Sequence, residues 1–169
     1  MPASAASIAE LLEHELATLG DRRVVDHIRN LLVSPKVQMR AWDYGQPGEA
    51  YPCWIVLEHP ASNTGIAYCE HGFGPAFPWG LLFLEGVEHM SMGMDSGWFE
   101  RFLEAYFESK APLELPIWRV FENHGADFPG KPISPEGTWE KTWADVERLR
   151  RTDSSARFDC WQSIYDRDT

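Results

Sequence analysis

Basic residues are scarce in this sequence. Its 169 residues include 15 Lys and Arg against 26 Asp and Glu, for a formal net charge of −11. A surface with that balance repels nucleic acid and anionic lipid, and it attracts cationic partners. We therefore expect a protein that binds neither nucleic acid nor a membrane surface.

Long hydrophobic runs are missing as well. No apolar segment approaches the roughly 20 residues needed to span a bilayer. The opening stretch MPASAASIAELLEHEL lacks the basic region of a signal peptide, so we expect a cytoplasmic protein. Cysteine is rare, with only Cys53, Cys69 and Cys160. In that compartment the three thiols are expected to be reduced, and their odd number argues against a disulfide framework.

The acidic excess is concentrated in the middle of the chain. Residues 1–48 hold six acids and five bases, residues 49–130 hold twelve and three, and residues 131–169 hold eight and seven. The middle segment therefore carries −9 of the total of −11. This localisation predicts a basic protein partner, although an acidic surface also serves solubility alone.

The length fits a single domain over residues 1–169, and its first part reads as helical. Ser7 and Glu10 have the spacing of a capping box, and apolar residues follow at helical intervals until Gly20. Asp21 is a good cap for a second helix, which Pro35 would end. We expect a helical hairpin over residues 1–34.

The rest of the chain alternates between strand and helix patterns. Residues 35–122 are predicted to hold a sheet and an aromatic helix over 98–107, and residues 123–169 a loop and a C-terminal helix near 139–150. The predicted strands are 37–44, 53–57, 64–70, 81–84 and 117–121. The expected fold class is α+β: a mostly antiparallel sheet of about five strands, an N-terminal helical hairpin and two further helices.

The stretch HMSMGMD, residues 89–95, permits two interpretations. Its alternating methionines would share one face of an extended segment, and thioethers suit Cu(I). They are Met90, Met92 and Met94. The alternative is a helix start, because Asp95 and Ser96 are good caps just before the aromatic helix. We adopt the helix interpretation, with the methionines filling core space.

Cysteine and histidine also meet in the stretch Cys69-Glu-His71. If the hairpin pairs residues whose numbers sum to 122, Cys53 lies opposite Cys69. Zinc needs four ligands, and neither a C-x-x-C nor an H-x-x-x-H motif supplies the rest. There is no G-x-S-x-G motif, and GFGPAFPWG lacks the features of a phosphate loop. We therefore predict structural cysteines, no catalytic residues, no metal and no cofactor.

Two features are candidates for binding a partner. The loop at residues 71–80 carries aromatic side chains stiffened by prolines, which makes good interface anchors. The predicted aromatic helix presents carboxylates at i, i+4 and i+8 on its polar face. The candidate residues are Phe73, Phe77, Trp79, Glu100, Glu104 and Glu108. A loop folded over the edge of the core and an ordinary solvated helix face are the alternatives.

Small size, acidity, an α+β pattern and the tryptophan- and aromatic-rich stretch GFGPAFPWGLLFLEG together resemble the immunity proteins of bacterial polymorphic toxin systems. The resemblance is one of type and carries no diagnostic motif. It implies a non-enzymatic protein that binds and blocks a basic toxin domain. Two alternatives stay open: a small enzyme or metal protein using Cys69, His71 and nearby carboxylates, and a scaffold or regulatory subunit.

Overall fold

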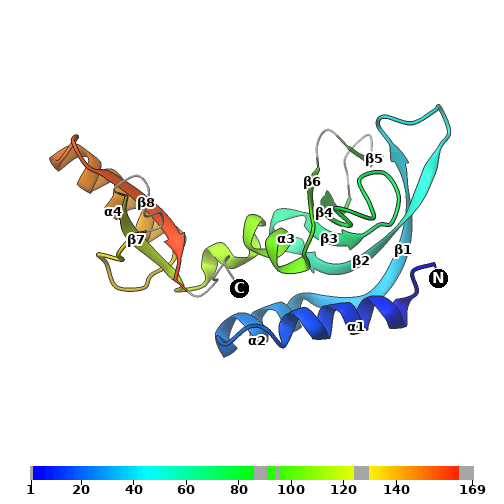
Figure 1. Ribbon diagram of the computed structural model, residues 1–169, viewed down its shortest axis with the longest axis horizontal. Coiled ribbons are helices and arrows are strands. Elements are labelled where there is room, and N and C mark those ends of the chain that lie inside the picture. Colours follow the sequence, from blue (N-terminus) through cyan, green and yellow to red (C-terminus); the bar gives the residue numbers. More distant parts are fainter. Residues whose placement is uncertain (1, 86–90, 94–95, 124–129, 164–169) are drawn as a thin grey trace. The chain divides into compact units, whose positions relative to one another are not determined.

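A computed structural model describes residues 2–85, 91–93, 96–123 and 130–163 (Figure 1). The chain divides into two compact units, Met1–Ala111 and Pro112–Thr169, each with its own strands. Over the described ranges there are four α-helices, a six-stranded sheet and a two-stranded sheet, so the predicted α+β class is confirmed. The single domain stays a prediction, and each unit is described by itself.

Unit 1 begins with two helices, α1 (Ala5–Leu16) and α2 (Arg22–Leu31). The predicted cap at Ser7 is wrong by three residues. Ser4 is the cap, since its hydroxyl accepts from the Ser7 N–H at 3.2 Å while the Ser7 hydroxyl accepts from the Ser4 N–H at 2.9 Å. Alanines at positions 5 and 6 favour helix, which explains the earlier start.

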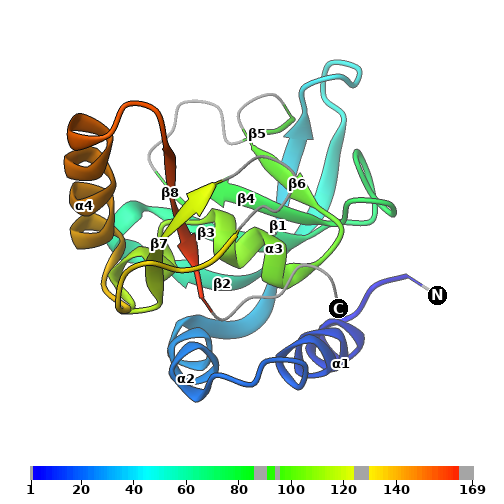
Figure 2. The ribbon, with the colours of Figure 1, turned by 60° about the vertical axis from the view of Figure 1, so that its left-hand side comes forward.

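The second cap was predicted correctly. Asp21 has an extended backbone conformation, and its carboxylate accepts from the Arg23 N–H at 2.8 Å. The chain then passes directly from α2 into a strand. In both views the two helices follow one another along one side of the sheet (Figures 1 and 2).

The large sheet has the order β5-β1-β2-β3-β4-β6, and only the β1–β5 pair is parallel. Its strands are β1 (Leu32–Trp42), β2 (Ala50–His59), β3 (Thr64–Tyr68), β4 (Trp79–Phe83), β5 (Ser91–Met92) and β6 (Gly97–Phe99). A short 3₁₀ turn, η1 (Pro60–Ser62), connects β2 to β3. The register joins Trp54 to Tyr68 and Ile55 to Ala67, both summing to 122 as predicted, before a bulge shifts it by one.

The sheet is curled almost into a barrel. Its two edge strands, β5 and β6, are consecutive in the chain, and five Cα steps from Met92 to Gly97 reach at most about 19 Å at 3.8 Å per step. The Arg40 side chain provides a second sign of the curl. It extends from β1 across the inside of the sheet and donates to the Phe83 carbonyl on β4 at 2.7 Å. The sheet therefore has an outer face and an enclosed inner face.

Helices cover the outer face, where α1 packs on β1, α2 on β2, and α3 (Phe102–Glu108) on β3, β4 and β6. The fully buried side chains of these helices are Ile8, Val24, Ile28, Phe102, Leu103 and Tyr106. The inner face carries a smaller core with a high share of small residues and sulfur. Its buried members are Cys53, Ile55, Ala67, Cys69, Leu82 and Met92.

The prediction of one helix over residues 98–107 is wrong in its first half. Trp98 and Phe99 lie in strand β6 and pair with Gly80 and Trp79 of β4. Gly80 has no side chain, and the Trp98 ring occupies the space where one would lie. Helix propensity is a weak preference, and this tertiary contact overrides it.

The predicted cap of that helix is therefore wrong too. Ser96 precedes a strand, and Asp95 lies outside the described residues. Helix α3 follows Arg101 instead, and its first free N–H groups are satisfied from α1. The Glu15 carboxylate accepts from Phe102 at 2.9 Å and from Leu103 at 3.0 Å. This long-range cap leaves no local signal in the sequence.

Unit 2 begins in a short 3₁₀ segment, η2 (Ala111–Glu114), and consists of a hairpin with one helix on it. Its elements are β7 (Trp118–Asn123), α4 (Trp139–Thr152) and β8 (Arg157–Gln162). The predicted helix near 139–150 is confirmed. The strand predicted at 117–121 exists, but it pairs with β8, which the sequence pattern did not indicate, rather than with the large sheet. Val120, Val146 and Phe158 form the core of this unit.

Candidate functional site

An aromatic cluster joins the β1–β2 turn to the loop after β3. The Trp42 ring lies 4.9 Å from Phe73 and 5.2 Å from Tyr44, both edge-on, and Phe73 also approaches Trp98 at 5.9 Å. Tyr44 is 60% exposed, whereas Trp42 and Phe73 are half-buried. The inner rings hold the outer one in place, so the cluster presents a fixed aromatic surface to solvent. We call Trp42, Tyr44 and Phe73 the aromatic cluster.

The predicted loop anchors separate into different environments. Phe73 belongs to the aromatic cluster, and Phe77 is 49% exposed on the same loop. Trp79 is only 2% exposed, because it packs on Tyr68 and Phe102 in the outer-face core. The expectation that Trp79 is an exposed anchor is therefore wrong. A partner contact by Phe73 and Phe77 stays a prediction.

The three predicted carboxylates do not form a helical ridge. Glu100 is exposed but precedes α3, so it does not share a helix face with the other two. Glu104 is half-buried and accepts from the Arg101 N–H at 3.2 Å. Glu108 is exposed in the last turn. The i, i+4, i+8 spacing was misleading because its first member, Glu100, lies before the helix begins.

Another carboxylate lies beside the aromatic cluster. Glu49 closes the β1–β2 turn by accepting from the Gln46 N–H at 2.8 Å, and it also accepts from the Tyr51 hydroxyl. These bonds stabilise the ionised carboxylate, so the pKa of Glu49 is lowered. The Tyr51 ring stacks on His71 at 4.6 Å, almost parallel. The turn is thus negative at neutral pH and lies next to exposed aromatic surface.

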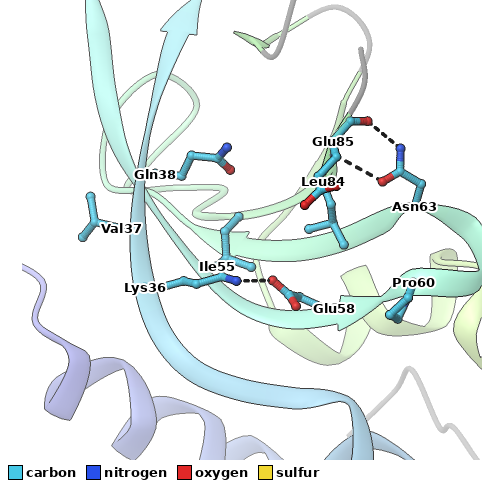
Figure 3. A pocket seen from close by; sticks show the side chains of 9 residues that line it. All are labelled: Lys36, Val37, Gln38, Ile55, Glu58, Pro60, Asn63, Leu84 and Glu85. Atoms are coloured by element: carbon cyan, nitrogen blue, oxygen red, sulfur yellow. Dashed lines mark hydrogen bonds and ion pairs between the residues drawn. The ribbon is translucent and has the colours of Figure 1, made fainter.

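A pocket of about 740 Å³ opens at the other end of the sheet (Figure 3). One wall carries an ion pair between Lys36 and Glu58 at 2.5 Å. Opposite it, the Asn63 side chain exchanges hydrogen bonds with the backbone of Glu85. The remaining lining residues are Val37, Gln38, Ile55, Pro60 and Leu84. The charged lining residues are one cation, Lys36, which is paired with Glu58, and a second carboxylate, Glu85.

Arg40 is a buried cation between the pocket and the inner-face core. Its residue is 1% exposed, and its Nη2 donates to the Gln38 side chain and to the Phe83 carbonyl, both at 2.7 Å. Its Nε has no hydrogen-bond partner, and within the described part of the chain no carboxylate pairs with it. Desolvation lowers the pKa of Arg40. A buried charge without a counter-ion is costly and calls for an explanation.

Three sulfur atoms meet on the inner face. Continued one residue beyond the Trp54–Tyr68 pair, the register brings Cys53 opposite Cys69, and both residues belong to the same buried cluster. The Cys53 Sγ also lies 3.6 Å from the Met92 Sδ. The neighbouring Cys69 thiol and then burial raise the pKa of Cys53, whereas the neighbouring Cys53 thiol lowers the pKa of Cys69. We call these three residues the sulfur cluster.

The structure thus joins two stretches that the sequence keeps apart. Met92 comes from HMSMGMD, whereas His89, Met90 and Met94 lie outside the described residues. His71, which shares a short motif with Cys69, is exposed and stacks on Tyr51. Across the described residues, no group of three or more His, Cys, Asp or Glu is placed to hold a metal ion. Arg40 was missed altogether, since its burial depends on the curl of the sheet.

Comparisons with known proteins give no relative to reason from. No family model, no curated protein and no solved structure matches this chain. Within the described residues, no helix has the length and apolar character that crossing a membrane requires. The chemistry of the residues themselves therefore has to carry any proposal about function.

Proposed function

We propose that this chain is an acidic protein-binding module that holds a basic protein partner. The observation that carries the proposal is the aromatic cluster beside the negative β1–β2 turn. Tyr44 is 60% exposed yet held edge-on to Trp42 and Phe73. Large aromatics that are already rigid lose little entropy on binding, which is why they dominate interface energetics.

The charge distribution supports a basic partner. Residues 49–130 hold twelve acids and three bases, and this segment includes Glu49 and the loop of the aromatic cluster. A negative surface accelerates encounter with a positive one and selects against acidic competitors. A protein that neutralises a basic toxin domain, of the kind to which the sequence bears a resemblance, fits both features. The role of Glu100, Glu104 and Glu108 in such a contact remains part of this proposal.

The alternative of an enzyme based on Cys69 and His71 is less well supported. Cys69 is fully buried, and the His71 ring lies on Tyr51 at the surface. A thiol nucleophile needs access to substrate and a base within hydrogen-bond reach. The geometry described here provides neither for this pair.

Binding to a basic toxin domain, taken from the adjacent gene where that gene encodes one, tests the proposal. We expect a one-to-one complex, and Tyr44→Ala should weaken it at least tenfold, because the cluster loses its outermost ring. Ile133→Ala removes a 45% exposed apolar side chain from unit 2 and serves as the matched control. The on-rate should fall as salt is raised. Absence of a complex, or equal effects of the two variants, would contradict the proposal.

A further inference from the structure

The sulfur cluster has the composition and spacing of a soft-metal site. Cys53, Cys69 and Met92 are each 0% exposed; Cys53 lies in β2, Met92 lies in β5, and Cys69 directly follows β3. Metal–sulfur bonds of about 2.3 Å in a trigonal arrangement would separate the sulfur atoms by about 4.0 Å. The Sγ–Sδ distance of 3.6 Å between Cys53 and Met92 is within a few tenths of an ångström of that value.

A second observation concerns charge. Arg40 is opposite Tyr51 in the β1–β2 register, so it is a diagonal neighbour of Cys53 on the inner face. Its guanidinium is buried, its Nε is unpaired, and no described carboxylate balances it. An anion created at the sulfur cluster would therefore find its counter-ion already in place.

We propose that Cys53, Cys69 and Met92 bind one monovalent soft metal ion of the Cu(I) class, with Arg40 balancing the charge. On binding, two S–H bonds break, two metal–thiolate bonds and one metal–thioether bond form, and two protons leave to solvent. No electron is transferred. One cation and two thiolates give the site a charge of −1, which the Arg40 guanidinium neutralises.

The donor set distinguishes Cu(I) from zinc. Thiolate and thioether sulfur are the ligands that Cu(I) prefers, and it accepts three of them. Structural zinc requires four ligands, usually thiolate or imidazole. Among the residues described, nothing supplies a fourth donor of that kind to the cluster. None of its three ligands is exposed, so a bound metal would not touch a protein partner directly, although Trp42 of the aromatic cluster packs against the sulfur cluster.

Competition for Cu(I) tests the inference directly. The reduced full chain is titrated without oxygen against a chromophoric Cu(I) chelator. We expect one Cu(I) per chain and an affinity that rises with pH, because two protons are displaced. Met92→Leu keeps the volume and should weaken binding at least tenfold, and Cys69→Ala should abolish it. Cys160→Ser alters the one cysteine outside the cluster and should change nothing.

X-ray absorption of the wild-type chain with Cu(I) keeps the test independent of how the variants fold. Three sulfur ligands are expected. Two sulfurs, or nitrogen and oxygen ligands, would overturn the inference, as would a chelator that removes all the Cu(I). If Met92→Leu left the Cu(I) affinity unchanged, or Cys160→Ser lowered it, the metal would bind outside the sulfur cluster. Tighter binding of Zn(II) than of Cu(I) would also count against it.

Discussion

At the scale of single residues, position in the fold changes what a side chain does. Asp21 and Arg40 illustrate the contrast. Asp21 caps the helix that begins at the next residue, and this role can be predicted from the neighbouring sequence alone. Arg40 sits in an ordinary-looking strand, and only the curl of the sheet makes it a buried cation. Local roles are predictable from local patterns, whereas burial is not.

The Asp21 cap predicts a pH-dependent stability. Hydrogen bonds from Arg23, from its side chain first and then its N–H, lower the pKa of Asp21. Because its pKa is lower in the folded than in the unfolded state, the ionised carboxylate stabilises the fold at pH values above its unfolded-state pKa of about 3.9. This stabilisation is lost as the pH falls through the folded-state pKa. Asp21→Asn retains a good cap without the charge. The free energy of unfolding of the wild type should therefore exceed that of this variant by up to about 1 kcal/mol at pH 7, and by less at pH 3.

Urea unfolding at the two pH values measures that difference. Asp26→Asn serves as the control, because it removes an exposed carboxylate from the same helix. An equal gap between wild type and Asp21→Asn at pH 7 and pH 3 would show that the charge contributes nothing.

At the scale of elements, the least predictable helix is the one that other elements define. Helix α3 has seven residues, too few for stability of its own, and five of them are buried. Its boundary is set by Trp98 pairing with β4 and by the carboxylate of Glu15 from α1. An isolated sequence pattern therefore extended it through a strand.

Removing the long-range cap should destabilise unit 1. Glu15→Ala deletes both acceptors of the Phe102 and Leu103 N–H groups, and loss of a helix cap costs about 0.5–2 kcal/mol. Glu10→Ala changes an exposed carboxylate of the same helix and should cost less than about 0.5 kcal/mol. Denaturant midpoints of the two variants give the comparison. Equal midpoints would mean that the cap is not energetically significant.

In the candidate site, too, contacts within one hairpin could be predicted from the sequence, whereas contacts between distant segments could not. The pairing of Cys53 with Cys69 was predictable, since a hairpin of two short strands has few registers. The aromatic cluster was only half predictable, because Phe73 is in a recognisable aromatic loop whereas Trp42 and Tyr44 reach it from the preceding hairpin. Met92 joined the cysteines through the parallel pairing of β5 with β1, a contact that no sequence spacing encodes.

At the scale of the whole molecule, the two compact units have separate cores. Val146 is fully buried in unit 2 among side chains of α4, β7 and β8. Val146→Ala should therefore weaken this unit by about 2 kcal/mol. Hydrogen exchange should accelerate in α4, β7 and β8 and stay unchanged in β2 and β3. Faster exchange in both units would show that the chain unfolds as one domain, as its length alone suggests.

The order of strands in the curled sheet has a consequence for synthesis on the ribosome. The edge strands β5 and β6, which border β1 and β4, come from residues 91–99, after the four inner strands of the sheet. A nascent chain that ends before residue 91 can form the sheet β1-β2-β3-β4. The outward backbone N–H and C=O groups of β1 and β4 then have no neighbouring strand. Such rows attract other strands, which is the usual route to aggregation. Strands β5 and β6 thus protect the sheet from pairing with other chains. Their rapid synthesis should therefore affect aggregation more than their few hydrogen bonds affect stability.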